Sequence, residues 1–531
     1  MKRVLLGVML AMSTAAGATG YDVTEKSVAA LQADMVSGRT TSEEIVQAYL
    51  ARIDAIDRRG PALHSIIAVN PDAVAAAKAS DAARKAGQAH GDLFGIPVLV
   101  KDNIETADAM PTTAGSLALK DNLTHRDAPF IAQLRAAGAI ILGKTNLSEW
   151  ANIRSSHSIS GWSAVGGLVK NPYVLDRSAC GSSSGSGAAV AASLGAVAIG
   201  TETDGSLVCP GSINGIVSLK PTVGLVSRTH VVPISHSQDT PGPMGRSVAD
   251  VAALLTAMAG SDPADKATAA ADAHKTDYGK AVQNASLKGV RIGVLHTDGT
   301  PPTEEDAVFA GALDAMKKAG AVIVPVSFDP PSADRAGALE LAVLLTELKA
   351  DLNLYLATLP AAVRTRTLAD VIAFDNATPR EMALIGHDLF VTAEKTKGLD
   401  DPDYTKALNE VRAMARDNGL DAIFGENKID VLVRETDEPS WRVDLVKGDN
   451  DGSDTAFLPA VAGYPHLTVP MGYVKGLPVG LSFIGKPWSE AQLLAFGAAF
   501  EKETQARKPP SYLPSVEESP DAEEVFKPAS R

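Results

Sequence analysis

The chain has 531 residues, of which 45% are hydrophobic, and its net charge at pH 7 is −14. This length fits a single large α/β domain with an insertion, and the apolar content supports a substantial core. The negative charge is spread along the chain, which argues against general binding to nucleic acids or to anionic membranes. Because no cysteine and histidine pattern has metal-site spacing, we expect no metal and no other cofactor.

The N-terminal segment has the three parts of a secretory signal peptide. Residues 1–3 are Met-Lys-Arg, residues 4–12 are a short apolar core, and residues 16–18 form an Ala-x-Ala cleavage site. We therefore predict a signal peptide over residues 1–18 and an exported protein, periplasmic or secreted, in a bacterium. The apolar core is too short to span a membrane, so we expect no stable membrane association after cleavage. An uncleaved N-terminal helix is the alternative.

Helical and strand patterns alternate along the mature chain. Residues 41–44 (Thr-Ser-Glu-Glu) form a capping box before apolar residues at helical spacing. Helices are expected within residues 24–58 and at residues 73–86, 129–137, 188–194, 248–258, 304–319 and 342–356. Strands are expected at residues 96–100, 139–142, 196–199, 215–219, 290–295 and 321–326. This alternation predicts a mixed or parallel sheet that is covered by helices.

Two segments near the C-terminus differ from this pattern. Residues 330–450 are mostly helical, and the amphipathic helix at residues 342–356 either packs over the core or belongs to a cap that shapes a substrate cleft. From residue 506 to residue 531, prolines and acidic residues predict a poorly ordered tail.

Lys101 directly follows the apolar strand at residues 96–100. A lysine at the end of a strand is usually solvated, and it is rarely buried unless it is paired. If it is buried, desolvation favours the neutral amine, which is a usable base.

Two glycine- and serine-rich turns flank the small-residue segment at residues 188–199. The first is Cys-Gly-Ser-Ser-Ser-Gly-Ser-Gly at residues 180–187, and the second is Gly-Thr-Glu-Thr-Asp-Gly-Ser at residues 200–206. Glycine lets a backbone approach a ligand closely, and a serine hydroxyl can act as a nucleophile. Two such turns that converge would suit acyl transfer. A flexible linker is the alternative, but the apolar segment between the turns argues against it.

The first turn also matches a different enzyme pattern. Residues 181–185 satisfy Gly-x-Ser-x-Gly, the nucleophile elbow of α/β-hydrolases, with Ser183 as the nucleophile. That mechanism needs an acid and a histidine downstream, and His230, His236 and His466 are available. We keep this interpretation as a rival.

The lysine-ended strand and the two turns, in this order, resemble the amidase signature family, and most of all its bacterial peptide amidase branch. The match continues through residues 215–222, 239–244 and 458–481, and it covers roughly residues 25–505. The resemblance implies an amidase-signature α/β/α sandwich with a large mixed sheet. It places one domain at residues 19–505, with residues 330–450 as a helical cap-like insertion.

The resemblance also implies a Ser-cisSer-Lys triad. Ser206 would be the nucleophile, Ser182 would follow a cis peptide bond and relay the proton, and Lys101 would be the base. Four backbone N–H groups would form the oxyanion hole, namely those of Thr203, Asp204, Gly205 and Ser206. The branch implies hydrolysis of a peptide C-terminal amide to carboxylate and ammonia through an acyl-enzyme, with no obligate protein partner.

The chain departs from the family pattern in the second turn. Glu202 stands where the family usually has aspartate, and we expect it to be structural. Asp204 stands where the family often has glycine, which puts the geometry of the oxyanion hole in question. Leu207 and Val208 replace the Ile-Arg of many relatives. Ser183 and Ser184 are expected to form hydrogen bonds within the first turn.

Other functions remain open at this stage. A broad small-amide or aryl-amide hydrolase is the alternative enzyme, and a catalytically silent amide-binding protein is the alternative outside enzymes. The glutamine-tRNA amidotransferase subunit of the same family works in the cytosol with partner subunits, which does not fit an export signal.

The two cysteines, Cys180 and Cys209, each flank one of the turns. Export permits a disulfide, and the two residues could pair if the turns converge. Buried free cysteines are the alternative.

Overall fold

The structure is a computed structural model that describes residues 20–295, 303–328, 332–450 and 455–518. The predicted signal peptide at residues 1–18 lies outside the described residues. The strands, in chain order, are β1 (Ile66–Val69), β2 (Pro97–Lys101), β3 (Ile140–Thr145), β4 (Trp162–Ser163), β5 (Gly167–Leu168), β6 (Val197–Glu202), β7 (Val217–Lys220), β8 (Thr240–Gly245), β9 (Arg291–Leu295), β10 (Val322–Val326), β11 (Val431–Glu435), β12 (His466–Val474) and β13 (Leu477–Ile484).

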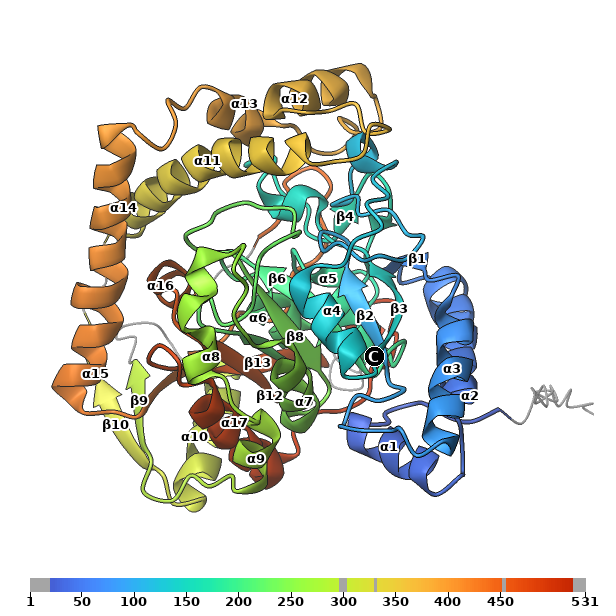
Figure 1. The fold of residues 1–531 in the computed structure, drawn as a ribbon. Helices are drawn as coiled ribbons and strands as arrows, with labels where there is room; N and C mark the ends of the chain where they lie inside the picture. The colour runs from blue at the N-terminus through green and yellow to red at the C-terminus, as the bar shows by residue number, and fades with distance from the viewer. Residues whose placement is uncertain (1–19, 296–302, 329–331, 451–454, 519–531) are drawn as a thin grey trace, which may run out of the picture.

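Helices surround these strands (Figure 1). The α-helices are α1 (Val28–Val36), α2 (Ser42–Arg52), α3 (Ala73–Lys85), α4 (Pro129–Ala136), α5 (Ser184–Ala191), α6 (Val208–Ile213), α7 (Val248–Met258), α8 (Ala271–His274), α9 (Tyr278–Gln283), α10 (Glu304–Lys318), α11 (Ala333–Ala357), α12 (Leu368–Ala377), α13 (Asp388–Glu394), α14 (Pro402–Ala415), α15 (Asp421–Asn427), α16 (Phe457–Ala462) and α17 (Glu490–Thr504). Short 3₁₀ and π turns are η1 (Ile53–Arg58), η2 (Leu117–Leu119), η3 (Glu149–Asn152), η4 (Lys266–Ala270), η5 (Arg416–Leu420) and η6 (Val516–Glu518).

Eleven strands form one mixed sheet with the order β1-β3-β2-β6-β8-β7-β12-β13-β11-β9-β10. β2 pairs in parallel with β3 and β6, and β9 pairs in parallel with β10 and β11, whereas the other neighbours are antiparallel. Every residue of β2, β3 and β6 is buried, as expected for central strands with helices on both faces. The expected amidase-signature α/β/α sandwich is confirmed.

Side chains of β12 show which helices cover which face. Thr468 faces α6, since a Cβ on Gly211 of that helix would lie 2.7 Å from its Cγ2. The flanking residues Leu467 and Val469 face α17, where a Cβ on Gly497 would meet both side chains. Successive side chains of a strand point to opposite faces, so α6 and α17 cover opposite sides of the sheet.

The predicted elements are present, with two shifted starts. The capping box forms as predicted, because Thr41 accepts a hydrogen bond from the backbone N–H of Glu44 and the Glu44 side chain returns one. α11 begins at Ala333 rather than at residue 342. α5 begins at Ser184 rather than at residue 188, because Gly185 lets its first turn pack closely. A Cβ at that glycine would lie 2.3 Å from the carbonyl oxygen of Asn146.

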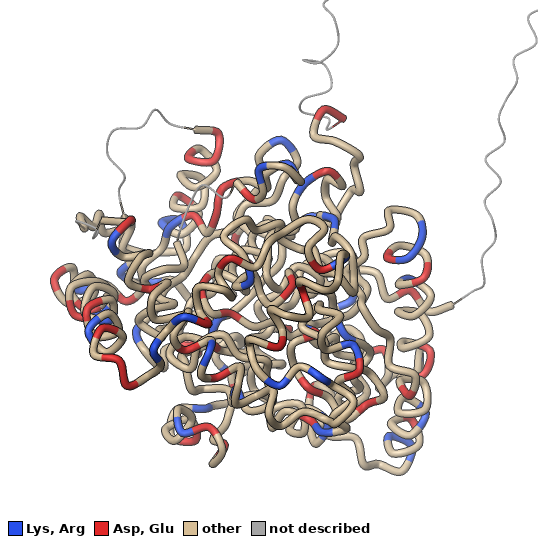
Figure 2. The backbone as a smooth tube through the Cα atoms, turned by 90° about the horizontal axis from the view of Figure 1, so that it is seen from above, with Lys and Arg blue, Asp and Glu red and all other residues tan. Residues whose placement is uncertain are grey.

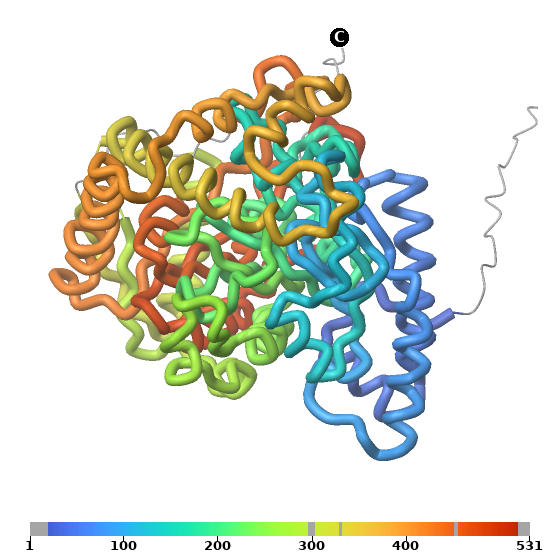
Figure 3. Tube along the Cα trace, turned by 45° about the horizontal axis from the view of Figure 1, so that its top comes forward, coloured from blue at the N-terminus to red at the C-terminus, as the bar shows by residue number. Residues whose placement is uncertain are grey.

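The segment expected to be a cap divides into two parts. Its helical part runs from α11 to α15, and residues 431–435 then return to the central sheet as β11. Leu344, Leu348 and Leu352 of α11 belong to one buried apolar cluster with Trp150 and other residues of the main domain. Figure 3 shows this segment, in yellow to orange, lying across the cyan part of the chain.

The prediction of a poorly ordered tail is wrong for residues 506–518. The Arg507 guanidinium forms an ion pair with Glu25 and donates a hydrogen bond to the Ala191 carbonyl. Leu513 exchanges backbone hydrogen bonds with the segment from Tyr173 to Leu175. These partners are far away in sequence, so the polar composition of the tail did not reveal them.

Positively and negatively charged residues are interspersed along the whole described backbone, as Figure 2 shows. Within the described ranges, the structure contains no helix with the length and apolar character that a membrane span requires.

Candidate active site

Lys101 is the last residue of the buried strand β2, and its side chain is fully buried. Its Nζ lies 2.8 Å from Ser182 Oγ and 2.9 Å from Ser183 Oγ. It also lies 2.9 Å from Thr201 Oγ1 and 3.2 Å from the Thr201 carbonyl oxygen. Oxygen atoms therefore surround the amine, and no ion pair holds it within the described part of the chain.

Burial lowers the pKa of Lys101 from 10.5 to about 7, because desolvation disfavours the ammonium form. The carboxylates of Glu202 and Asp239 act in the opposite direction and raise this pKa, but burial has the larger effect. Near neutral pH the side chain can therefore exist as a neutral amine. This state is the one that a general base needs.

The first turn holds Ser182 against Lys101. The peptide bond between Gly181 and Ser182 is cis, as the family resemblance implied. The Ser182 side chain is fully buried, and the backbone carbonyl of Ser182 accepts a hydrogen bond from the Ser148 N–H. Ser184 donates its hydroxyl to the Cys180 carbonyl, so it closes the turn as expected.

The second turn carries Ser206 between β6 and α6. Gly205 has a φ of 75°, a conformation that glycine adopts without steric cost. Glu202 Oε2 accepts hydrogen bonds from the N–H groups of Leu207 and Val208, at 2.8 Å and 3.1 Å. This carboxylate therefore anchors the start of α6 just after Ser206, which agrees with the structural role expected for it.

Asp239, at the start of the β8 region, holds the other side of the same turn. Its Oδ1 accepts the Thr203 hydroxyl at 2.6 Å, and its Oδ2 accepts the N–H groups of Ile234 and Ser235. Burial raises the pKa of Asp239 to about 6. Glu202 and Asp239 together fix both ends of the turn whose N–H groups are the candidate oxyanion donors.

Ser206 opens onto a pocket of about 590 Å³. The other candidate oxyanion residues, Thr203, Asp204 and Gly205, line the same pocket, as does Leu344 of the helical segment. A residue of the segment expected to be a cap thus forms part of the pocket wall. Asp204 also lies in this wall. Burial lowers the pKa of the nearby Lys220 to about 8, and the negative charge of Asp204 acts in the opposite direction.

The two serine turns meet through their backbones. The Ser183 N–H donates to the Ser206 carbonyl at 3.2 Å. In the described part of the chain, no hydrogen bond joins the hydroxyls of Ser182 and Ser206. The structure thus brings together Lys101 and Ser182 directly and places Ser206 on the adjoining turn.

The nucleophile-elbow interpretation does not match this geometry. The Ser183 hydroxyl donates to the Thr201 carbonyl at 3.0 Å and is fully buried beside Lys101. His236 is bonded to Asp351, and His466 to Ser482. Among the described residues, no histidine hydrogen-bonds to Ser183.

Two residues of the site, Thr201 and Asp239, lie in segments that match the family pattern, but the sequence assigned neither of them a role. Thr201 supplies two oxygens to Lys101, and its hydroxyl also accepts the Asn103 amide at 2.9 Å. Asp239 was noticed only as part of a family match. Their importance depends on contacts between distant segments, and a spacing pattern does not contain that information.

Cys180 and Cys209 form a disulfide, so one of the two possibilities left open by the sequence is realised. Both residues are buried and both line the Ser206 pocket. Across the described ranges, no group of three or more histidine, cysteine, aspartate or glutamate side chains is arranged to hold a metal ion.

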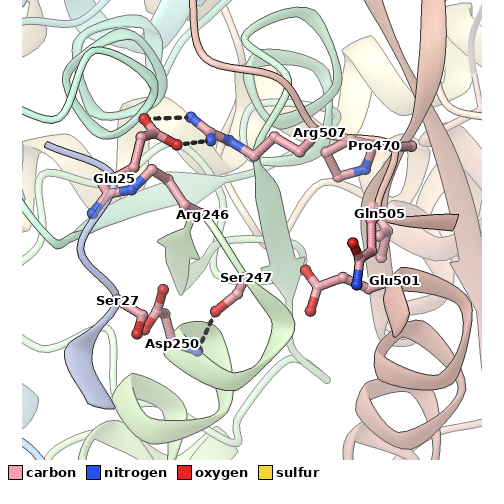
Figure 4. A pocket seen from close by; sticks show the side chains of 11 residues that line it. Glu25, Ser27, Arg246, Ser247, Asp250, Pro470, Glu501, Gln505 and Arg507 are labelled. Atoms are coloured by element: carbon pink, nitrogen blue, oxygen red, sulfur yellow. Dashed lines mark hydrogen bonds and ion pairs between the residues drawn. The ribbon is translucent and has the colours of Figure 1, made fainter. Parts of the chain in front are cut away.

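A second pocket, of about 270 Å³, lies between the N- and C-terminal segments (Figure 4). It is lined by charged residues that include Glu25, Arg246, Asp250, Glu501 and Arg507. Most of these groups already bind backbone atoms or each other: Asp250 accepts the Val28 N–H, and Glu501 accepts the Val248 N–H. This pocket contains neither serine turn, so the Ser206 pocket is the candidate active site.

Comparison with known proteins agrees with the geometry. The family model described as Amidase matches residues 44–494. The crystal structure of native peptide amidase from Stenotrophomonas maltophilia is similar with a TM-score of 0.87 and 49% identity, covering 92% of this chain and 99% of that chain. A probable amidase of Arabidopsis thaliana is 38% identical and covers 93% of both chains.

A further relative is the glutamyl-tRNA(Gln) amidotransferase subunit of Chloroflexus aurantiacus, which is 34% identical over 90% of this chain and 96% of its own. These matches extend over nearly the whole described domain, in agreement with the lysine-ended strand and the two serine turns. The chain therefore belongs to the amidase signature family and is an amide-hydrolysing enzyme similar to bacterial peptide amidase.

Proposed function

We propose that this enzyme hydrolyses the C-terminal amide of peptides to a carboxylate and ammonia, with Ser206 as nucleophile, Ser182 as proton relay and Lys101 as base. The observation that carries the proposal is the contact between a buried, readily deprotonated Lys101 and Ser182, on a turn that touches the turn of Ser206. The peptide substrate is supported by the 49% identity to the peptide amidase structure.

The hydrogen bonds around Lys101 support its role as a base. The Ser183 hydroxyl donates to the Thr201 carbonyl, so Ser183 Oγ accepts from the amine. Thr201 Oγ1 receives the Asn103 amide and lies beside Nζ as a second acceptor. A neutral amine has two N–H groups, which these two oxygens can take. Its lone pair is then left for the Ser182 hydroxyl.

The reaction follows from this arrangement. Ser206 Oγ attacks the amide carbonyl while its proton passes to Ser182 Oγ, and Ser182 gives its own proton to Lys101. The ammonium of Lys101 returns a proton through Ser182 to the leaving ammonia. Catalytic hydrogen bonds are often long in an unliganded site and tighten when substrate binds, and the contact between the hydroxyls of Ser206 and Ser182 would form in this way. Water then attacks the acyl-enzyme by the same route.

The backbone N–H groups of residues 203–206 are the proposed oxyanion donors. A donor of this kind is worth about 3 kcal/mol in the transition state. Glu202 and Asp239 fix the turn from both sides, so the donors are held in place before the negative charge develops.

We also propose that the enzyme is exported and works without a cofactor or an obligate protein partner. The Cys180–Cys209 disulfide supports export, because such bonds persist in oxidising compartments. The net charge of −14 does not favour binding of nucleic acids.

The test measures release of carboxylate, together with ammonia or amine, by the purified mature enzyme from a peptide amide, a small aliphatic amide, an aryl amide and the matching peptide with a free carboxylate. We expect release from the peptide amide and none from the free peptide. Hydrolysis of the small or aryl amide without hydrolysis of the peptide amide would remove the peptide assignment. Binding of all amides without turnover would support a silent binding protein.

The mechanism is tested with matched variants. Ser206→Ala should lower kcat by on the order of 10⁴-fold or more, since the nucleophile is lost. His236→Gln and His466→Gln should each keep kcat within about threefold, because neither histidine touches the serine turns. A large loss of kcat in a histidine variant that remains folded would favour the rival mechanism.

A further inference from the structure

We infer that the Cys180–Cys209 disulfide positions the two serine turns relative to each other, and that hydrolysis is fast only while this bond is oxidised. The inference rests on the proposed roles of Ser182 and Ser206. It concerns two positioning residues that line the Ser206 pocket but supply none of the reacting atoms.

The bond lies between the two proposed catalytic serines. Cys180 precedes Ser182 by two residues in the first turn, and Cys209 follows Ser206 by three residues in α6. The Cα atoms of the two cysteines are 6.1 Å apart. The disulfide is therefore a covalent connection between the segment of the relay and the segment of the nucleophile.

The backbone at Cys180 gives the bond a specific role. This residue has a φ of 53°, in the left-handed region where a side chain crowds the backbone and where glycine is the usual residue. Such a conformation persists only where surrounding contacts hold it. The Cys180 N–H donates to Ser178 Oγ at 3.0 Å, and its carbonyl accepts the Ser184 hydroxyl, but both partners belong to the same short stretch of chain.

Contacts other than the disulfide also join the two turns. The Ser183 N–H donates to the Ser206 carbonyl, and the Asn214 amide donates to the Ala179 carbonyl at 2.9 Å. These hydrogen bonds do not depend on the oxidation state of sulfur. Reduction should therefore leave the domain folded and release only the restraint on the Cys180 side chain. Its backbone can then relax toward a commoner conformation and move Ser182, two residues away.

The bond is accessible to a small reductant. Both cysteines line the Ser206 pocket, next to Gly181 and Gly205. A dithiol such as dithiothreitol supplies two electrons and two protons. The S–S bond breaks, two thiols form on the protein, and the reagent closes to its own cyclic disulfide. Ligands that fill the pocket should hinder this step.

The first experiment reduces the mature wild-type enzyme with dithiothreitol, counts free thiols and measures steady-state kinetics with the peptide amide. We expect kcat to fall about tenfold or more as two thiols appear, while KM changes by less than about twofold, because a small displacement of a relay group slows the chemical step. Reoxidation should restore kcat. A product carboxylate at saturating concentration should slow the appearance of thiols at least about threefold.

The second experiment compares two variants that lack both thiols and differ at one position. Cys180→Gly with Cys209→Ser supplies the residue that adopts positive φ freely, whereas Cys180→Ser with Cys209→Ser does not. We expect the glycine variant to keep kcat within about threefold of the oxidised wild type. Its kcat should not change when dithiothreitol is added. We expect the serine variant to resemble the reduced wild type. Circular dichroism of both should show the native fold at the assay temperature.

The outcomes separate this inference from the proposed function. An oxidised wild type that releases no ammonia from any amide overturns the proposed function. An active wild type that keeps kcat after two thiols have appeared overturns the role of the disulfide. So does unfolding on reduction, or equal kcat in the glycine and serine variants.

Discussion

The amine of Lys101 is governed by two opposing effects. Complete burial removes the hydration that stabilises an ammonium ion, while the carboxylates of Glu202 and Asp239 stabilise it from a distance. Burial has the larger effect and brings the pKa to about 7. The balance suits a group that must accept a proton in one step and return it in the next.

This pKa predicts how activity depends on pH. Below pH 7 Lys101 is protonated and cannot accept the Ser182 proton, so kcat/KM should fall about tenfold per pH unit on the acid side. Above this pH the amine is neutral and kcat/KM should reach a plateau. Rates measured between pH 5 and 9 check the prediction, and Lys101→Met should remove the activity. A flat profile through pH 7 would contradict a lysine base.

The charge of Asp239 should influence the pH at which kcat/KM falls on the acid side of the profile, which we call the acid limb. Asp239→Asn removes a carboxylate that raises the pKa of Lys101, so the limb should move to lower pH. The amide oxygen can still accept the Thr203 hydroxyl, but the amide nitrogen cannot accept the N–H groups of Ile234 and Ser235, so circular dichroism must show that the variant keeps the native fold. Asp272→Asn is the matched control, because Asp272 is exposed and is not among the groups that act on Lys101. An equal shift in both variants would show that net charge, rather than this contact, is responsible.

At the scale of elements, the sequence predicted the segments that carry the reactive residues better than the segments that pack around them. The strand before Lys101, both serine turns and most helices follow from local patterns of residues. β8 was missed because its sequence, Thr-Pro-Gly-Pro-Met-Gly, is typical of a turn. Both prolines pair with β6, but β7 pairs with β8 only at Met244 and Gly245, so neither proline has to donate a hydrogen bond on the β7 side.

A buried ionic cluster joins the helical segment to the pocket wall. Arg154 donates to the carboxylates of Glu149 and Glu381 and to the carbonyls of Ile385 and Gly386, and it is fully buried. Residues 151–153, directly before it, line the active-site pocket. The link between α12 and α13 is thus tied to the segment that borders the substrate.

Replacing this arginine should therefore be costly. Arg154→Met would leave two buried carboxylates without their cation, which typically costs about 3 to 5 kcal/mol. The control is Arg335→Met, which breaks an exposed ion pair with Glu410 and should cost no more than about 1 kcal/mol. Urea unfolding of both variants measures the difference. Equal losses would mean that the buried cluster does not hold the helical segment in place.

At the scale of the whole molecule, the two ends of the described chain meet beside the core. Figure 4 shows Glu25 facing Arg507 across this junction. Arg507 also donates to the carbonyl of Ala191, the last residue of α5, where a cation is favoured by the helix dipole. α5 begins within the first serine turn, so this junction fixes the far end of the helix that carries part of the site.

Composition predicted a single α/β domain, and the family resemblance predicted its sheet and sandwich. Neither could predict that residues 506–518 pack on the core. Arg507 and Glu25 are separated by 482 positions, and only the folded chain shows that they pair. The same holds for the helical segment. Its amphipathic pattern indicated burial, but only the tertiary fold shows that it shares an apolar cluster with Trp150.

The junction between the chain ends should contribute to stability without affecting catalysis. In a double-mutant cycle, Glu25→Gln, Arg507→Met and the combined variant should give a coupling of about 1 kcal/mol, since the pair is partly exposed to solvent. Arg507→Met alone should lose more, because it also removes the contact with Ala191. KM and kcat should stay within about twofold, as neither residue lines the Ser206 pocket. The exposed pair of Lys318 and Glu503 provides the control cycle and should show a smaller coupling. Equal coupling in the two cycles would mean that the junction is no more than a surface contact.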